Sequence, residues 1–253
     1  MDIVIIGSGN VASVLGRKFK AAGHRILQVY SRHAAAASEL AYKLGSASTN
    51  YKSTISRSAD FYLVAVSDDA IADATSDLFL PGKVVAHTAA SVPKEVLKKV
   101  TAHYGVFYPL QSLRKDMDTI PDIPVSIDGI DEKTKKLLGA LAHSIAAEHV
   151  VEAGDDARLK LHVAAVVVSN FVNHLYKLAE DYCRKEGLDF KQLLPLIEET
   201  AIRIKEISPS SAQTGPAIRH DRETIQKHLA LLNKHPQLKS IYLLLTESVQ
   251  TNP

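Results

Sequence analysis

The chain has 253 residues and lacks several features that would assign it to a special class of protein. Its one cysteine, Cys183, excludes an intrachain disulfide and suits a reducing compartment. The formal net charge of +2 gives no electrostatic reason to expect nucleic acid or a membrane surface as a partner. Apolar runs such as Val163 to Val168 are far too short to cross a bilayer. The N-terminus shows no basic-then-apolar signal sequence, so we expect a cytoplasmic protein.

The first part of the chain shows a strand, a glycine-rich turn, a helix and a second strand. The apolar runs Asp2–Ile6 and Ile26–Tyr30 flank the turn Gly7-Ser8-Gly9-Asn10-Val11-Ala12, which has the spacing G-x-G-x-x-A. In such a turn the first glycine allows a sharp bend, and the second lets the backbone approach a phosphate. The N-terminus of the next helix offers free N–H groups. We predict that Gly7, Gly9, Asn10 and Val11 bind the pyrophosphate of a dinucleotide.

An acidic residue is missing where the second strand ends. Proteins that bind NAD carry Asp or Glu there to accept hydrogen bonds from the ribose hydroxyls. This chain has no acid between Asp2 and Glu39, and the strand ends in Ser31-Arg32. A hydroxyl and a guanidinium suit a 2′-phosphate, so we predict NADP as the cofactor, bound by Ser31 and Arg32.

The pattern of apolar residues divides the chain into two parts. Short apolar runs alternate with helical patterns as far as residue 153, which predicts an α/β fold with a doubly wound, mostly parallel Rossmann sheet. We expect residues 124–127 and 149–151 to be edge strands. From residue 154 on the pattern is helical throughout, so we predict a Rossmann domain over 1–153 and an all-helical domain over 154–253. The long helix over residues 155–185 is apolar all round at its centre, which indicates burial.

Polar residues follow two of the predicted parallel strands, at the sheet edge where ligands of doubly wound folds bind. Ser67 is expected near the nicotinamide ribose. His87 is a candidate proton donor because its ordinary pKa is close to neutral pH, and a neutral histidine bonded to the backbone is an equal alternative. We predict no metal site.

The helical part contributes weaker candidates for substrate contacts. On the long helix one narrow stripe contains Arg158, His162, Ser169 and Asn173, which suits either structural hydrogen bonds or a pocket. Arg219 and Asp221 lie on a stiff Gly-Pro loop, where they could meet an anionic substrate. Asp221 also has the position expected of a helix N-cap.

The chain resembles a bacterial family of Rossmann-like proteins whose helical C-terminal domain has no assigned function. The resemblance is carried by the glycine-rich turn, Ser31-Arg32, Tyr108-Pro109-Leu110-Gln111, Ser169-Asn170 and Thr214-Gly215-Pro216-Ala217-x-Arg219-x-Asp221 with His228. It implies an NADP oxidoreductase of the deazaflavin-dependent type. The N-terminal half is also similar to pyrroline-5-carboxylate reductase and 3-hydroxyisobutyrate dehydrogenase, whose relatives often dimerise through the helical domain.

One departure from these relatives bears on the reaction. Hydroxyacid dehydrogenases of that group carry a catalytic lysine followed four residues later by asparagine, whereas Lys160 is followed by Ala164. We therefore predict an NADP-dependent oxidoreductase that transfers a hydride between NADP(H) and a small carbonyl or imine substrate in an interdomain cleft. We also expect a homodimer through the helical domain. The alternatives are a non-catalytic NADP-binding sensor and an NADP:deazaflavin oxidoreductase.

Overall fold

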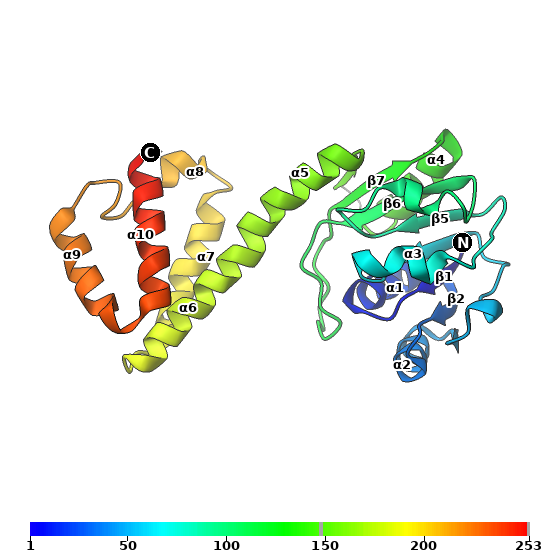
Figure 1. Ribbon diagram of the computed structural model, residues 1–253, viewed down its shortest axis with the longest axis horizontal. Coiled ribbons are helices and arrows are strands. Elements are labelled where there is room, and N and C mark those ends of the chain that lie inside the picture. The colour runs from blue at the N-terminus through cyan, green and yellow to red at the C-terminus, as the bar shows by residue number, and fades with distance from the viewer. Residues whose placement is uncertain (147–148, 252–253) are drawn as a thin grey trace. The chain divides into compact units, whose positions relative to one another are not determined.

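The computed structural model describes residues 1–146 and 149–251, and contacts group the chain into two compact units, Met1–Asn170 and Phe171–Pro253. The first unit contains the sheet and the start of the long helix, and the second unit is helical (Figure 1). The last strand ends at Glu152, so the predicted boundary after residue 153 marks the end of the sheet. The compact unit itself continues 17 residues further along the helix, to Asn170.

The described residues form an eight-stranded sheet in the order β3-β2-β1-β4-β5-β6-β7-β8. The strands are β1 (Asp2–Ile6), β2 (Arg25–Tyr30), β3 (Ala47–Thr49), β4 (Phe61–Val64), β5 (Val84–His87), β6 (His103–Pro109), β7 (Val125–Gly129) and β8 (Val150–Glu152). Among the strand pairs that the described residues form, only β6–β7 is antiparallel. The predicted Rossmann sheet is confirmed. Because β2 and β4 both pair with β1, the chain reverses its direction across the sheet at the carboxyl end of β1, where such folds bind ligands.

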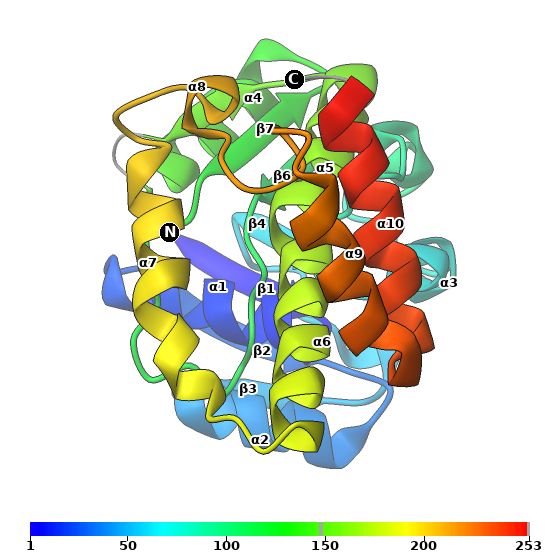
Figure 2. The same cartoon turned by 90° about the vertical axis from the view of Figure 1, so that its left-hand side faces the viewer.

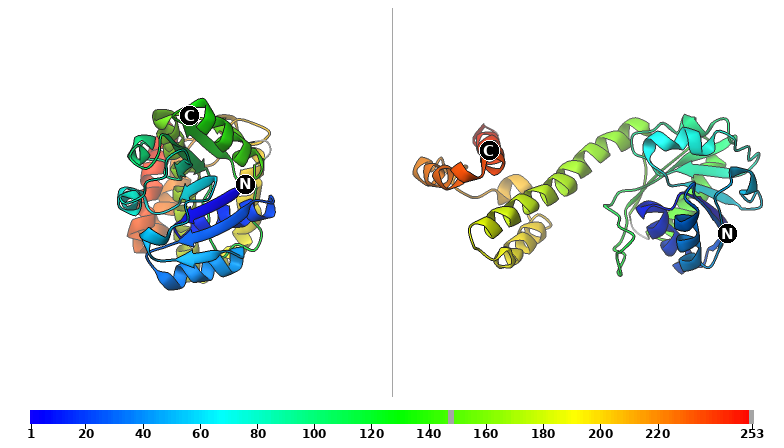
Figure 3. Two further views of the ribbon diagram at one scale, coloured as in Figure 1. Left: turned by 90° about the vertical axis from the view of Figure 1, so that its right-hand side faces the viewer. Right: turned by 60° about the horizontal axis from the view of Figure 1, so that its bottom comes forward.

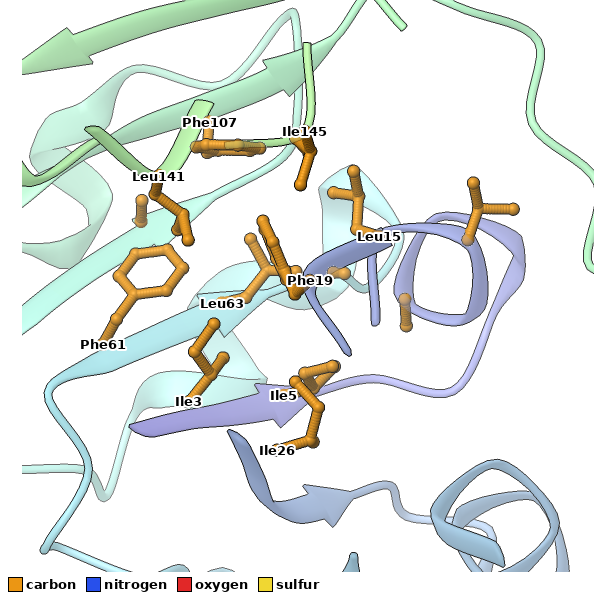
Figure 4. Packing of buried hydrophobic residues seen from close by; sticks show 14 of the residues in the cluster. Ile3, Ile5, Leu15, Phe19, Ile26, Phe61, Leu63, Phe107, Leu141 and Ile145 are labelled. Atoms are coloured by element: carbon orange, nitrogen blue, oxygen red, sulfur yellow. The ribbon is translucent and has the colours of Figure 1, made fainter. Parts of the chain in front are cut away.

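Both faces of the sheet are covered, which explains why β1 and β4 read as continuous apolar runs. Ile3 and Ile5 pack on one face, against helices α1 (Asn10–Ala21), α2 (Ala34–Leu44) and α4 (Glu132–His143). Figure 4 shows these isoleucines beside Leu15 and Phe19 of α1. Val4 and Ile6 alternate with them and pack on the other face, with α3 (Ile71–Thr75) and the short turn η3 (Lys94–Leu97). The remaining short turns of this unit are η1 (Lys52–Thr54) and η2 (Asp68–Ala70).

The expectation of two edge strands after residue 123 is half right. β8 lies at the edge of the sheet, but β7 lies between β6 and β8 and is fully buried. Its sequence Val125-Ser126-Ile127-Asp128-Gly129 contains the polar residues Ser126 and Asp128, which are buried with the rest of the strand. Asp128 is buried, and the half-buried Lys94 ammonium lies 2.7 Å from its carboxylate, so the charge is compensated in place.

One helix runs from Asp155 to Lys185, as Figure 3 (right) shows. It consists of α5 (Asp155–Ala165), a π-helical turn η4 (Val166–Phe171) and α6 (Val172–Lys185). The expectation that its centre is buried is wrong for this single chain, because Val163, Val167 and Val168 are 59%, 51% and 71% exposed. The apolar character of this stretch is therefore not explained by packing within one chain.

The second unit contains α6 and the helices that follow it (Figure 2). They are η5 (Phe190–Leu193), α7 (Leu194–Arg203), α8 (Pro209–Ala212), α9 (Arg222–Leu231), η6 (Leu232–Lys234) and α10 (Pro236–Thr251). Among its described apolar side chains, only Leu178, Cys183, Ile225 and Leu232 are buried. Among the described residues, no helix is both long and apolar enough to span a membrane.

Candidate functional site

The turn between β1 and α1 has the geometry of an anion cradle. Gly7 has φ +124°, and a Cβ there would lie 2.1 Å from the carbonyl oxygen of Ala65, so only glycine fits. Gly9 is the N-cap of α1 and makes no side-chain cap, and a Cβ there would meet nothing within 4 Å. No side chain therefore caps the start of α1, and its first turn contains no acidic residue. This arrangement fits a pyrophosphate.

A pocket of about 380 Å³ extends from this turn along the carboxyl ends of β1, β2 and β4. It is lined by Gly7, Ser8, Gly9, Asn10, Val11, Tyr30, Ser31, Arg32, His33, Ala65, Val66, Ser67, Ala70, Asp73 and Ala74. All seven residues predicted to bind the cofactor are therefore in one pocket. Apolar side chains at one side suit a nucleotide base, and the glycine turn and Arg32 suit its phosphates.

The end of β2 carries the residues predicted to select NADP. The buried Ser31 hydroxyl accepts a hydrogen bond from the Ser8 hydroxyl at 2.9 Å, which ties the end of β2 to the glycine-rich turn. Arg32 is exposed at the pocket. The one carboxylate in the described lining, Asp73, lies 3.8 Å from the Lys52 ammonium. Asp69, which does not line the pocket, is close enough for the Arg32 charge to contribute to lowering the pKa of its carboxyl. No acid follows Arg32 on β2 itself, and a guanidinium in this position fits a 2′-phosphate.

Asn10 has a structural contact that the sequence did not reveal. Its Oδ1 accepts a hydrogen bond from the backbone N–H of Lys115 at 3.0 Å. Two turns later Arg17 donates to the carbonyl oxygens of Met117 and Asp118, at 2.7 and 3.1 Å. These bonds fasten the segment after β6 onto α1. The Asn10 side chain is thus occupied, and its position at the helix start leaves the backbone N–H for an anion.

A second pocket, of about 510 Å³, begins where the first ends, since Val11 lines both. It is lined by Val11, Thr88, Tyr108, Pro109, Leu110, Gln111, Ser112, Leu161, His162, Ala164, Ala165, Val168, Ser169 and Asn170. All of these residues belong to the first compact unit. The volume is in the range of small-molecule sites, and the pocket adjoins the cofactor pocket at the end of the sheet where substrates of doubly wound folds bind.

Two hydrogen-bonded pairs join the strand side of this second pocket to the long helix. The Tyr108 hydroxyl lies 2.8 Å from Nδ1 of His162, with the rings edge to face, and the hydroxyls of Ser112 and Ser169 are 3.0 Å apart. Burial, together with the nearby charge of Asp68, raises the pKa of Tyr108, so the phenol keeps its proton at neutral pH. A protonated phenol paired with an imidazole can deliver a proton to a substrate oxygen or nitrogen.

The helix wall of this pocket includes the π-helical turn over Val166–Phe171. Such turns are rare and occur frequently at functional sites. A π-helical turn contains one residue more than an α-helical turn, so the residues after it are rotated about the helix axis. Positions calculated at 100° per residue for a regular α-helix therefore no longer predict which residues share a face. Ser169 and Asn170 both line the pocket with His162, although a regular helix would place Asn170 on another face.

His87 lies apart from both pockets and is completely buried. Its Nδ1 accepts a hydrogen bond from the backbone N–H of Ala89 at 3.2 Å, so the neutral ring carries its proton on Nε2. Burial lowers the pKa of His87 to about 4, and the nearby positive charge of Arg158 adds to this effect. These features favour the structural reading of His87 over the role of proton donor.

Arg158 is equally buried, and its contacts hold the segment that follows β5. Its guanidinium donates to the carbonyl oxygens of Ala90 and Val92, at 3.1 and 2.9 Å, and to the Asp155 carboxylate at 2.7 Å. The bonds to Ala90 and Val92 hold the start of the long helix against the segment that follows β5. The Asp155 carboxylate compensates the positive charge of the buried guanidinium.

The loop before α9 lies in the second unit. Asp221 caps this helix, accepting hydrogen bonds from the N–H and the hydroxyl of Thr224 at 3.1 and 2.8 Å. These bonds lower the pKa of the Asp221 carboxyl. The predicted N-cap is therefore confirmed, and both carboxylate oxygens are engaged. Arg219 is exposed, and the next residue, His220, has a left-handed backbone with φ 51°.

Tyr108 is the functional candidate that sequence reasoning missed. Its motif, Tyr108-Pro109-Leu110-Gln111, contributes to the family resemblance but does not by itself indicate a role for the phenol. Two features of the sequence could have pointed to it. Tyr108 lies at the end of a predicted strand, and His162 lies on a helix that was expected to be buried and would then need a polar partner. No local pattern indicates that these residues meet across 54 positions.

Two family models match the sequence. Residues 2–91 match the family described as NADP oxidoreductase coenzyme F420-dependent, and residues 123–249 match the domain of unknown function DUF2520. The second match begins inside the sheet, just before β7, and continues into α10. A search of curated proteins gave no match.

Solved structures with the same fold extend over nearly the whole chain. A Bacteroides fragilis protein, provisionally described as an NADP oxidoreductase, is 37% identical, with 99% of this chain and 98% of that chain covered and a TM-score of 0.90. An imine reductase from Myxococcus stipitatus in complex with NADP+ is 17% identical (coverage 100% and 95%, TM-score 0.68). A 1-pyrroline-5-carboxylate reductase from Streptococcus pyogenes is 14% identical (coverage 99% and 98%, TM-score 0.65). The last two similarities concern the fold alone.

Proposed function

Because this chain belongs to the family of NADP oxidoreductases that carry the DUF2520 domain, we propose that it reduces a small carbonyl or imine compound with NADPH. The observation that carries the proposal is the adjacency of two pockets that share Val11. One has the glycine turn of a dinucleotide site. The other holds the Tyr108–His162 pair at hydrogen-bond distance.

NADP is the cofactor of this family, and the residues of the first pocket fit it. The free N–H groups after Gly9 bind the pyrophosphate in this proposal, and Arg32 binds the 2′-phosphate. Ser67 contacts the nicotinamide ribose. When bound, NADPH supplies the hydride that the reduction needs.

The protein itself supplies the proton. In the proposed step the substrate C=O or C=N accepts a hydrogen bond from the Tyr108 hydroxyl. As the carbon is reduced, the phenol proton passes to the substrate oxygen or nitrogen. The phenolate is stabilised by His162, which returns a proton to it from solvent. Ser169, linked to Ser112, orients the other end of the substrate. A general acid in this position contributes about 10²–10⁴-fold to the rate.

The test is NADPH oxidation in the presence of a panel of ketones, aldehydes and ketone–amine mixtures. Replacing Tyr108 by phenylalanine removes the acidic proton and keeps the ring, so kcat should fall by about 10²–10⁴-fold with unchanged NADPH affinity. Tyr104→Phe, on the same strand but outside both pockets, is the control and should retain full activity. Equal activity of Tyr108→Phe and wild type would contradict the assignment of Tyr108.

A second candidate function is NADPH-dependent reduction of a deazaflavin. The match of residues 2–91 to a coenzyme F420-dependent family favours it, and the second pocket would then hold the deazaflavin ring. Adding a deazaflavin to the same assay separates the two candidates. Tight NADPH binding with no acceptor from either class would favour a sensor.

The assembly we propose is a cytoplasmic homodimer formed through the helical part. Large apolar side chains of the second unit are exposed in a single chain, at 43–67%: Phe171, Leu188, Leu194, Leu196, Ile202, Ile204, Ile207, Leu231, Leu243, Leu244 and Leu245. Monomeric proteins rarely leave so many apolar side chains uncovered. A second copy of the chain would cover them and the exposed valines of the long helix.

A further inference from the structure

The second pocket contains no lysine, arginine, aspartate or glutamate among the described residues that line it. Its apolar wall is built from Val11, Leu110, Leu161, Ala164, Ala165 and Val168. The polar groups are hydroxyls, amides and one imidazole. Such a lining can hydrogen-bond a carbonyl or imine, but it offers no permanent opposite charge to a carboxylate or an ammonium group.

Two charged side chains whose fields reach Tyr108, Asp68 and Arg158, do not line the pocket. Arg158 is 1% exposed, and its guanidinium donates to two backbone carbonyls and to Asp155. Its Nη1 has no hydrogen-bond partner among the described residues, but it is buried. Asp68, whose charge acts on Tyr108, accepts a hydrogen bond from Ser91. On the long helix the Lys160 ammonium is 2.7 Å from the Asp156 carboxylate, and neither residue lines the pocket. A carboxylate that entered this pocket would therefore lose water without gaining an ionic partner, at a cost in binding free energy.

We propose that the substrate is an uncharged carbonyl compound or imine with an apolar body, and that analogues bearing a carboxylate are rejected. This inference rests on the proposed function, because it assumes that the second pocket is the substrate site. Within the pocket, the Tyr108–His162 pair fixes the polar end of the substrate. The apolar wall receives its hydrocarbon part. The same pocket thus excludes amino-acid-derived substrates, which carry a carboxylate beside the reacting carbon.

A pair of ketones that differ only in charge tests the inference without turnover. Cyclohexanone and 4-oxocyclohexanecarboxylate are titrated by calorimetry against the full chain loaded with NADP+, so that no reduction can occur. We expect the neutral ketone to bind roughly tenfold or more tightly than the carboxylate, since an unpaired buried charge costs at least the ~1.4 kcal/mol that a factor of ten represents. Equal binding of the two ketones, or binding of neither, would overturn the inference.

A charge introduced into the wall should reverse the preference. Val168 lines the pocket and is 71% exposed, so Val168→Arg can be accommodated and would present a guanidinium to the ligand. We expect this variant to bind the carboxylate at least about tenfold more tightly than wild type does. Val167→Arg is the matched control, because Val167 is 51% exposed on the same helical turn but does not line the pocket. Identical gains in both variants would overturn the inference.

The two experiments distinguish failure of the inference about substrate charge from failure of the proposed reductase function. If the neutral ketone binds with the expected preference but no ketone or imine is ever reduced, the proposed function fails and the neutral character of the pocket stands. If NADPH-dependent reduction is observed but carboxylate substrates are preferred, the proposed function stands and the inference fails.

Discussion

The buried His87 should make the stability of the protein fall steeply in mild acid. Its side chain is completely buried, and its pKa of about 4 lies well below the ordinary value of 6.5. The unfolded chain, in which the imidazole meets water, binds a proton more readily than the folded chain. The stabilisation is therefore complete above about pH 6.5 and is lost progressively as the pH falls towards 4.

The size of this effect follows from the two pKa values. One pKa unit corresponds to 1.36 kcal/mol, so the whole difference amounts to about 3 kcal/mol, of which about 2 kcal/mol is lost between pH 7 and pH 5. Most carboxylates with lowered pKa values, such as Asp131, affect stability only below this window. His24, whose pKa burial also lowers, contributes in the same direction.

Urea denaturation at pH 7 and pH 5 measures the effect. His87→Gln removes the buried titrating group, so its unfolding free energy should fall by about 2 kcal/mol less than that of wild type over this interval. The contribution of His24 is present in both proteins and cancels in the comparison. His143→Gln, which changes an exposed histidine, should behave as wild type. If the unfolding free energy of His87→Gln depended on pH as strongly as that of wild type, the buried His87 would not be the group that causes the loss of stability in acid, and the reasoning would be refuted.

Three further predictions concern the cofactor, the cap and the assembly. Arg32→Ala should weaken NADPH binding by about ten- to a hundredfold and NADH binding little, whereas Arg57→Ala, outside the cofactor pocket, should change the affinity for neither cofactor. Equal losses of affinity for NADPH and NADH in Arg32→Ala would contradict a contact with the 2′-phosphate. Asp221→Ala should lower Tm by about 2–4 °C through loss of the helix cap and leave kcat unchanged; a large loss of kcat at unchanged Tm would make Asp221 catalytic. Light scattering should give twice the chain mass of 27.5 kDa, and a chain truncated after residue 153 should lose the dimer; a monomeric full chain would contradict the proposed assembly.

Much of the first unit could be predicted because its signals are local. At Gly7 of the G-x-G-x-x-A turn, the Ala65 carbonyl leaves no room for a side chain. The helix start after Gly9 needs backbone N–H groups that no side chain caps. Both requirements concern residues next to one another in the sequence, so the motif reveals them. Ser31 and Arg32 lie directly after a strand, so their place beside the turn follows from the fold.

The second pocket could not be predicted, because it depends on contacts between distant segments. Tyr108 meets His162, and Ser112 meets Ser169, only after the long helix is fastened to the sheet by Arg158. Because of the π-helical turn, Asn170 lines the pocket, whereas regular α-helical spacing predicts that it lies on another face of the helix. For His87 the sequence left two roles open, proton donor and neutral histidine bonded to the backbone, because the bond from the Ala89 N–H to its ring and its complete burial depend on how the segment after β5 folds back.

The central claim is that NADPH reduces a neutral carbonyl or imine in the pocket that contains Tyr108. Its most direct test uses NADPH carrying deuterium at the transferable position of nicotinamide C4, incubated with the chain and with the ketone that the panel shows to be most active. We predict one deuterium on the carbinol carbon of the product, detected by mass spectrometry, and its loss in Tyr108→Phe. Deuterium that stays in the cofactor, despite tight NADPH binding and the full set of carbonyl and imine acceptors, would contradict the claim.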